Sequence, residues 1–137
     1  MILVDTSAWL DFLNERDTAA ARHLDTVMER QLPFGIAGII YQELLQGTAS
    51  SRDFEELDSY LRTQRFYHLK HPVSSYARAA AIYARCRHMG ITPRSTIDCL
   101  IVQLALEHDL ILLHRDKDFP RIAQVVGELK LYESLTR

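Results

Sequence analysis

The chain has 137 residues, of which 47% are apolar and 25% charged, and these are the size and composition of one globular domain. Five Gly and four Pro are too few for a disordered or linker-rich protein, and no apolar run is long enough to cross a bilayer. Its two cysteines, Cys86 and Cys99, lack the spacing of a metal site or a disulfide framework, which indicates a reducing, cytoplasmic environment. We therefore expect a single domain over residues 1–137 with no membrane association.

Short apolar runs and helical periodicities alternate along the chain. In chain order we predict a strand at residues 2–4, helices near 9–13 and at 18–29, a strand at 33–37, helices at 40–46 and 51–64, a strand at 66–69, helices at 73–88 and 95–107, and strands at 110–113 and 129–132. The predicted strands are apolar throughout, as is typical of strands buried on both faces. The pattern predicts an α/β fold, a three-layer sandwich around a central parallel sheet of about five strands.

Five acidic side chains lie just after predicted strands or in the first turns of predicted helices. They are Asp5, Glu43, Asp98, Asp116 and Asp118. Because chemistry in an open parallel sheet gathers at the carboxyl ends of its strands, we expect these acids to converge on one edge. Taken singly, each also has a structural explanation: a helix N-cap for Asp5, a capping box for Asp98, a solvated helix position for Glu43, and a turn for the last two.

A cluster of these acids has a chemical consequence. Clustered carboxylates raise one another's pKa unless a cation lies among them, and oxygen ligands of this kind suit Mg²⁺ or Mn²⁺. Such ions activate water and neutralise phosphate charge in phosphodiester hydrolysis. With Asp5, Glu43, Asp98 and Asp116 set aside as metal ligands, 16 basic residues remain against 14 acidic ones. An acidic metal site in a slightly basic surface predicts a nuclease.

The net charge of -2 conceals an uneven distribution, because residues 59–97 contain neither Asp nor Glu. A basic stretch of this kind is typical either of a face that binds a polyanion or of arginines that solvate helix surfaces. The candidate phosphate-contacting residues within it are Arg62, Arg65, Arg85, Arg87 and Arg94.

Four segments together resemble the PIN-domain ribonucleases, most closely the VapC toxins of bacterial toxin–antitoxin pairs. Residues 2–7 (Ile-Leu-Val-Asp-Thr-Ser) match the first motif of that family, and Glu43, within residues 40–44, matches the acidic residue of the second. Residues 95–101 match the third motif and residues 112–119 the fourth. No single motif is specific, but all four in this order and at these separations are a strong signal.

The resemblance implies a metal site of Asp5, Glu43, Asp98 and Asp116, with Asp118 as a fifth candidate, and a sheet in the order 3-2-1-4-5. It places Thr6 and Ser7 where the family supplies supporting hydrogen bonds. These two residues and Arg115 are further candidates for contact with the substrate. One departure is His114, which stands where many relatives carry Thr or Ser.

The resemblance also implies partners. These are a structured RNA such as a tRNA as substrate, a cognate VapB-like antitoxin, and a second copy of the chain in a homodimer. An antitoxin helix could cover the apolar side chains of the first predicted helix, where Trp9, Leu10, Phe12 and Leu13 cannot all face one way. The alternative is a non-catalytic PIN-like module that binds RNA or protein, but such a module would have no need of the four acids.

Overall fold

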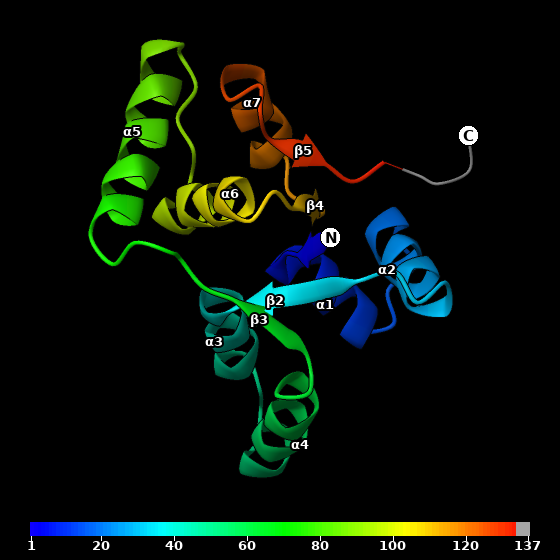
Figure 1. Ribbon diagram of the computed structural model, residues 1–137. Helices are drawn as coiled ribbons and strands as arrows, with labels where there is room; N and C mark the ends of the chain where they lie inside the picture. The colour runs from blue at the N-terminus through cyan, green and yellow to red at the C-terminus, as the bar shows by residue number, and fades with distance from the viewer. Residues whose placement is uncertain (134–137) are drawn as a thin grey trace.

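The computed structural model describes residues 1–133 and contains a five-stranded parallel sheet in the order β3-β2-β1-β4-β5 (Figure 1). The strands are β1 (Ile2–Val4), β2 (Phe34–Ala37), β3 (Arg65–Tyr67), β4 (Ile111–Leu113) and β5 (Lys130–Leu131). This order confirms the predicted sheet. The central strand β1 pairs in parallel with its neighbour β4, with Val4 opposite Leu113, so their carboxyl ends lie side by side.

Seven helices cover the two faces of this sheet within the described residues. They are α1 (Thr6–Leu13), α2 (Ala19–Glu29), α3 (Gly38–Gln46), α4 (Ser51–Leu61), α5 (Ser74–His88), α6 (Thr96–Glu107) and α7 (Asp118–Val125). The chain runs outward from β1 through β2 to β3 and then crosses the sheet to β4 and β5. Because connections between parallel strands are right-handed, this reversal of direction places α1–α4 on one face and α5–α7 on the other (Figure 1). None of these helices has the length and apolar character that crossing a bilayer demands.

The core lies on both faces of the sheet, which is why the central strands are apolar throughout. Leu3 and Val4 of β1 and Leu112 of β4 have no or almost no exposed surface. Trp9 of α1 is also fully buried, where its ring contacts those of Phe12, Phe34 and Tyr60. The expectation that an antitoxin helix covers Trp9 is therefore wrong, because this side chain belongs to the core of the chain itself.

Helix α7 is absent from the predicted elements, and the structure corrects the turn expected there. Its first turn contains Phe119 and Pro120, and a proline is tolerated in the first turn because the N–H groups there have no partner within the helix. Phe119 and Ile122 are fully buried, so packing against the sheet stabilises a helix that is short and begins without a side-chain cap.

Candidate active site

The site lies where the strand order reverses, between the carboxyl ends of β1 and β4. The chain continues the sheet for one further hydrogen bond, from the N–H of Asp5 to the carbonyl of Leu113 (2.9 Å). Crevices at such a reversal point are where open parallel sheets bind ligands, because the connections from the two strands diverge to opposite faces. Asp5 and the loop that carries Asp116 thus begin from neighbouring strands.

Asp5 is both the N-cap of α1 and a member of the acidic cluster, so its two sequence interpretations are compatible. Its Oδ2 accepts hydrogen bonds from the backbone N–H of Ser7 (3.1 Å) and from the Ser7 hydroxyl (2.6 Å). The side chain is buried, and burial raises its pKa although the two bonds from Ser7 lower it. The acid is held in one orientation and is costly to ionise without a nearby cation.

Glu43 reaches the site from α3, which begins directly after β2. The hydroxyl of Thr6 donates to Oε1 of Glu43 (2.7 Å) and so connects the second motif to the first. The Thr6 and Ser7 hydroxyls therefore each donate a hydrogen bond to one acid of the cluster, while contact of either residue with a substrate stays a prediction. Both hydroxyl groups donate their hydrogen bonds within the protein, and these bonds orient the two carboxylates.

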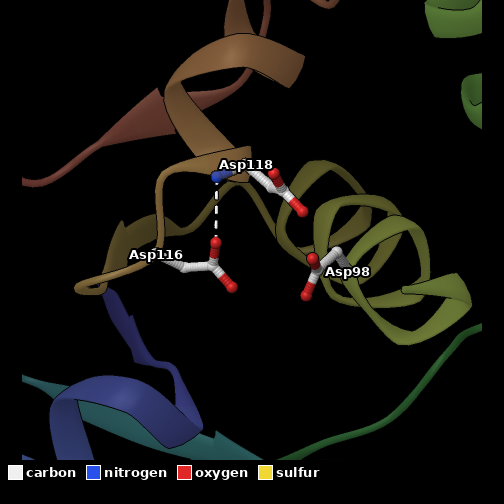
Figure 2. Close-up of side chains that lie close together, drawn as sticks. All are labelled: Asp98, Asp116 and Asp118. Atoms are coloured by element: carbon white, nitrogen blue, oxygen red, sulfur yellow. Dashed lines mark hydrogen bonds between the residues drawn. The ribbon is translucent and has the colours of Figure 1, made fainter. Parts of the chain in front are cut away.

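Asp98, Asp116 and Asp118 converge from three further segments of the chain (Figure 2). Each has a carboxylate oxygen within 4.8 Å of the others, a separation from which one cation could contact all three. Asp98 extends from the first turn of α6, Asp116 from the loop after β4, and Asp118 from the start of α7. The N–H of Asp118 donates to Oδ1 of Asp116 (2.9 Å), which fixes the spacing of the last two (Figure 2).

The pKa of Asp98 shows that no positive charge within residues 1–133 compensates this carboxylate. Burial raises the pKa of Asp98 to about 7, and the neighbouring charges of Asp116, Asp5, Asp118 and Glu43 all act in the same direction. The charges of the other four acids therefore all act on Asp98.

These carboxylates fit a hard divalent cation. The candidate ligand atoms are all carboxylate oxygens, as Mg²⁺ and Mn²⁺ prefer, and a cation would offset the burial and the neighbouring negative charges that raise the pKa of Asp98. Asp118 differs from Asp5 and Asp98, since two N–H groups of Arg94 donate to it and its pKa is lowered rather than raised.

The predicted phosphate-contacting arginines do not form one surface in the folded chain. Arg65 begins β3 and contacts Met1 Sδ (3.7 Å), so it lies at the amino ends of the strands, opposite the acids. Arg62 pairs with Asp58 one turn earlier in α4 (2.8 Å). Arg85 donates to the Val125 carbonyl, and the Arg87 guanidinium lies over the Tyr83 ring. Of the five, Arg94 is the arginine whose side chain pairs with acids of the cluster.

Arg115 has a structural partner that the sequence analysis missed, namely Asp11. The Asp11 side chain is fully buried in α1 and accepts hydrogen bonds from Arg115, Arg16 and Thr18. The backbone N–H of Arg115 donates to the Ser7 hydroxyl (2.9 Å), so the loop after β4 is tied twice to α1. The sequence did contain a signal for this pair, because Asp11 is a charged residue between the apolar Trp9, Leu10 and Phe12, and a charge in such a position requires a partner when the helix is buried.

His114 lies beneath the site. Its Nδ1 accepts a hydrogen bond from the N–H of Asp116 (3.1 Å), and its ring packs edge-on against Phe119. Burial lowers the pKa of His114, although the Asp116 charge opposes this effect, so the neutral ring supports the loop.

Comparison with known proteins identifies the family of this chain. Residues 2–125 match the family model of the PIN domain. The chain is 31% identical over 128 residues to VapC ribonuclease Mb1587 of Mycobacterium bovis and to ribonuclease VapC11 of Mycobacterium tuberculosis, covering 93% of this chain and 95% of each relative. Among solved structures, it resembles a chain of VapBC2 from Rickettsia felis, bound to a promoter DNA fragment, with a TM-score of 0.73 at 17% identity, covering 96% of this chain and 98% of that one. It also resembles a chain of a toxin–antitoxin complex from Klebsiella pneumoniae, with a TM-score of 0.68 at 22% identity, covering 96% of this chain and 100% of that one. The chain therefore belongs to the PIN domain family, in the group of the VapC ribonucleases.

Proposed function

We propose that this chain is a metal-dependent endoribonuclease, the toxin of a toxin–antitoxin pair, and that it hydrolyses phosphodiester bonds in RNA at the acidic cluster. The observation that carries the proposal is the convergence of Asp98, Asp116 and Asp118, whose carboxylate oxygens lie within 4.8 Å of one another. Burial, followed by the charges of the neighbouring acids, raises the pKa of Asp98 to about 7, and a divalent cation would offset both effects. Mg²⁺ is the proposed cofactor, and Mn²⁺, with similar ligand preferences, is expected to replace it.

The proposed roles follow from the position of each side chain. Asp5, Asp98 and Asp116, with Glu43, would hold the cation through their carboxylate oxygens. A cation bound there would activate a water molecule and neutralise the charge that develops on the phosphate. Ser7 keeps Asp5 in its orientation and Thr6 does the same for Glu43, so the carboxylates are arranged before the substrate arrives.

The test is RNA cleavage with and without EDTA, using Asp5→Asn and Asp98→Asn. Each variant is expected to lose roughly hundredfold of the activity, about 3 kcal/mol of transition-state stabilisation, because metal binding weakens while the shape of the side chain is kept. Asp17→Asn is the matched control, since the Asp17 side chain is 93% exposed and its ion-pair partner is Arg22, which is outside the acidic cluster.

The products distinguish the mechanism. With an activated water as nucleophile, the RNA 2′-hydroxyl takes no part in the attack, and the fragments should carry 5′-phosphate and 3′-hydroxyl ends. Cleavage that persists in EDTA, or fragments that end in 2′,3′-cyclic phosphate, would exclude this mechanism. A folded chain that binds RNA but cleaves none with Mg²⁺ or Mn²⁺ would instead be the non-catalytic module.

The proposal extends to partners and location. A structured RNA such as a tRNA is the proposed substrate, and a cognate VapB-like antitoxin is the proposed inhibitor. The likeness to chains of solved toxin–antitoxin complexes supports the latter. We also propose that the chain forms a homodimer. We further propose a cytoplasmic location, and the two buried, free cysteines support this location.

A further inference from the structure

The segment between α5 and α6 brings one arginine onto the acidic cluster. The backbone N–H of Arg94 donates to Oδ2 of Asp118 (3.0 Å), and its Nε donates to the same oxygen (3.2 Å). Its Nη2 donates to Oδ1 of Asp116 (3.2 Å). The guanidinium thus bridges the two acids that belong to the fourth motif, and it does so from the residue that precedes the N-cap of α6.

Asp118 is compensated by the protein in a way that Asp98 is not. Its side chain is only 3% exposed, and one of its oxygens already accepts two N–H groups of Arg94, while Arg121 lies 4.0 Å from the other. An acid that is already paired with cations of its own chain gains little from a metal ion.

Arg94 keeps part of its guanidinium available. The side chain is 71% exposed, and within residues 1–133 its side-chain hydrogen bonds use Nε and Nη2, so Nη1 is not used in these bonds. A planar guanidinium that is fixed through one edge presents its other edge in a defined direction, and this geometry suits a phosphate oxyanion.

We propose that Asp118 is a positioning residue that anchors Arg94, and that the anchored guanidinium binds an RNA phosphate beside the metal-binding acids. This inference rests on the proposed function, because it assumes that RNA reaches the cluster. It removes Asp118 from the metal ligands and gives Arg94 a position next to the reacting phosphate rather than on a distant basic face.

The decisive measurement is RNA affinity in EDTA, where no cleavage interferes. Arg94→Gln should weaken binding about tenfold, which corresponds to about 1.4 kcal/mol, through loss of one charge-assisted contact. Asp118→Ala should also weaken binding, although removal of a negative charge near a polyanion would by itself strengthen it. In the Arg94→Gln background, Asp118→Ala should cause no further loss, because the anchor then has nothing to hold. Arg22→Gln, which removes an exposed arginine paired with Asp17, is the matched control.

Two further variants keep the test valid if Asp118→Ala unfolds, which thermal denaturation would reveal. Asp118→Asn retains one acceptor oxygen and should lose less RNA affinity than the alanine variant. Arg94→Lys retains the positive charge but lacks the planar guanidinium with its several N–H donors, so it should bind RNA more weakly than the wild type. RNA affinity of Asp118→Ala, or of Asp118→Asn if the alanine variant unfolds, equal to or above that of the wild type would overturn the anchoring role.

Mn²⁺ affinity, measured by calorimetry without RNA, tests the other half of the proposal. Asp118→Ala should bind Mn²⁺ within about threefold of the wild type, whereas Asp98→Asn and Asp116→Asn should each bind it at least about tenfold more weakly. A loss in Asp118→Ala as large as that in Asp116→Asn would make Asp118 a ligand and refute its role as an anchor. A wild type that binds no RNA would contradict the proposed function and phosphate binding by Arg94, while the Mn²⁺ measurement would still decide the role of Asp118.

Discussion

Carboxylates of the same type behave in opposite ways in this chain, and their immediate partners decide which. The fully buried Asp11 is paired with Arg115, Thr18 and Arg16, and these bonds lower its pKa in spite of burial. Asp98 is also buried but is surrounded by other acids, and its pKa is raised to about 7. Uncompensated charge, rather than burial alone, distinguishes the acids of the active site from the acids that hold the fold together.

This difference predicts how stability depends on pH. Between its ordinary pKa of 3.8 and about 7, Asp98 binds more protons in the folded chain than in the unfolded one, so its contribution makes the free energy of unfolding fall as pH rises through that window. In EDTA, the wild type should therefore lose more stability between pH 5 and pH 8 than Asp98→Asn does, as measured by urea denaturation. Added Mg²⁺ at pH 8 should restore the wild type more than the variant.

The difference in pH dependence between the wild type and Asp98→Asn is not caused by the histidines. Burial lowers the pKa of His23 and of His114, which gives the opposite slope below pH 6.5, but both residues are present in wild type and variant. Equal losses of stability in the two proteins would show that Asp98 titrates normally.

At the scale of elements, the pairing of β2 with β3 depends on a close approach of side chain to backbone. Gly35 lies opposite Arg65, and a Cβ added at Gly35 would lie 2.5 Å from Cε2 of Tyr67 and 2.6 Å from the carbonyl oxygen of Arg65. Neither neighbour can move far, because the Tyr67 ring is buried and the carbonyl belongs to the paired strand.

Gly35→Ala is accordingly expected to destabilise the fold by about 2 kcal/mol, the cost typical of an overpacked core. Gly127→Ala is the matched control, since a Cβ there would meet no atom within 4 Å. Thermal or urea denaturation compares the two variants. A Gly35→Ala variant as stable as Gly127→Ala would show that strand β3 shifts freely relative to β2.

At the scale of the whole molecule, an apolar area on α5 is the candidate surface for the proposed homodimer. Val73, just before the helix, is 80% exposed and Tyr76 is 56% exposed. Tyr76 also lines an apolar hollow of about 300 Å³ between α5 and α6, with Tyr83 and Leu100 among its neighbours. Large apolar side chains next to a hollow are typical of surfaces that bind another protein chain.

Sedimentation of the purified chain should therefore show a dimer at micromolar concentration. Tyr76→Glu should shift it towards the monomer, because burying the new charge at the interface is costly. Phe54→Glu, at an exposed apolar position on α4, should leave the dimer intact. A monomeric wild type, or equal effects of the two variants, would exclude this surface.

The sequence by itself determined the apolar strands, most of the helices and the identity of the acids. Buried parallel strands must be apolar on both faces, and a chain that folds with right-handed connections has few ways to arrange them. The motifs that carry Asp5, Glu43, Asp98 and Asp116 could be recognised because each one combines an acid with the apolar pattern of a strand or helix.

Only the tertiary structure decided which charges meet. The acid-free stretch of residues 59–97 is continuous in the sequence, yet Arg65 lies at the amino ends of the strands and Arg94 at the carboxyl ends. The reason is that Arg65 begins strand β3, whereas Arg94 lies just before helix α6. Helix α7 and the buried pair of Asp11 with Arg115 escaped prediction for the same reason: their stabilising partners are distant in the sequence. Local patterns specify elements, whereas electrostatic compensation depends on contacts that exist only after the elements have packed.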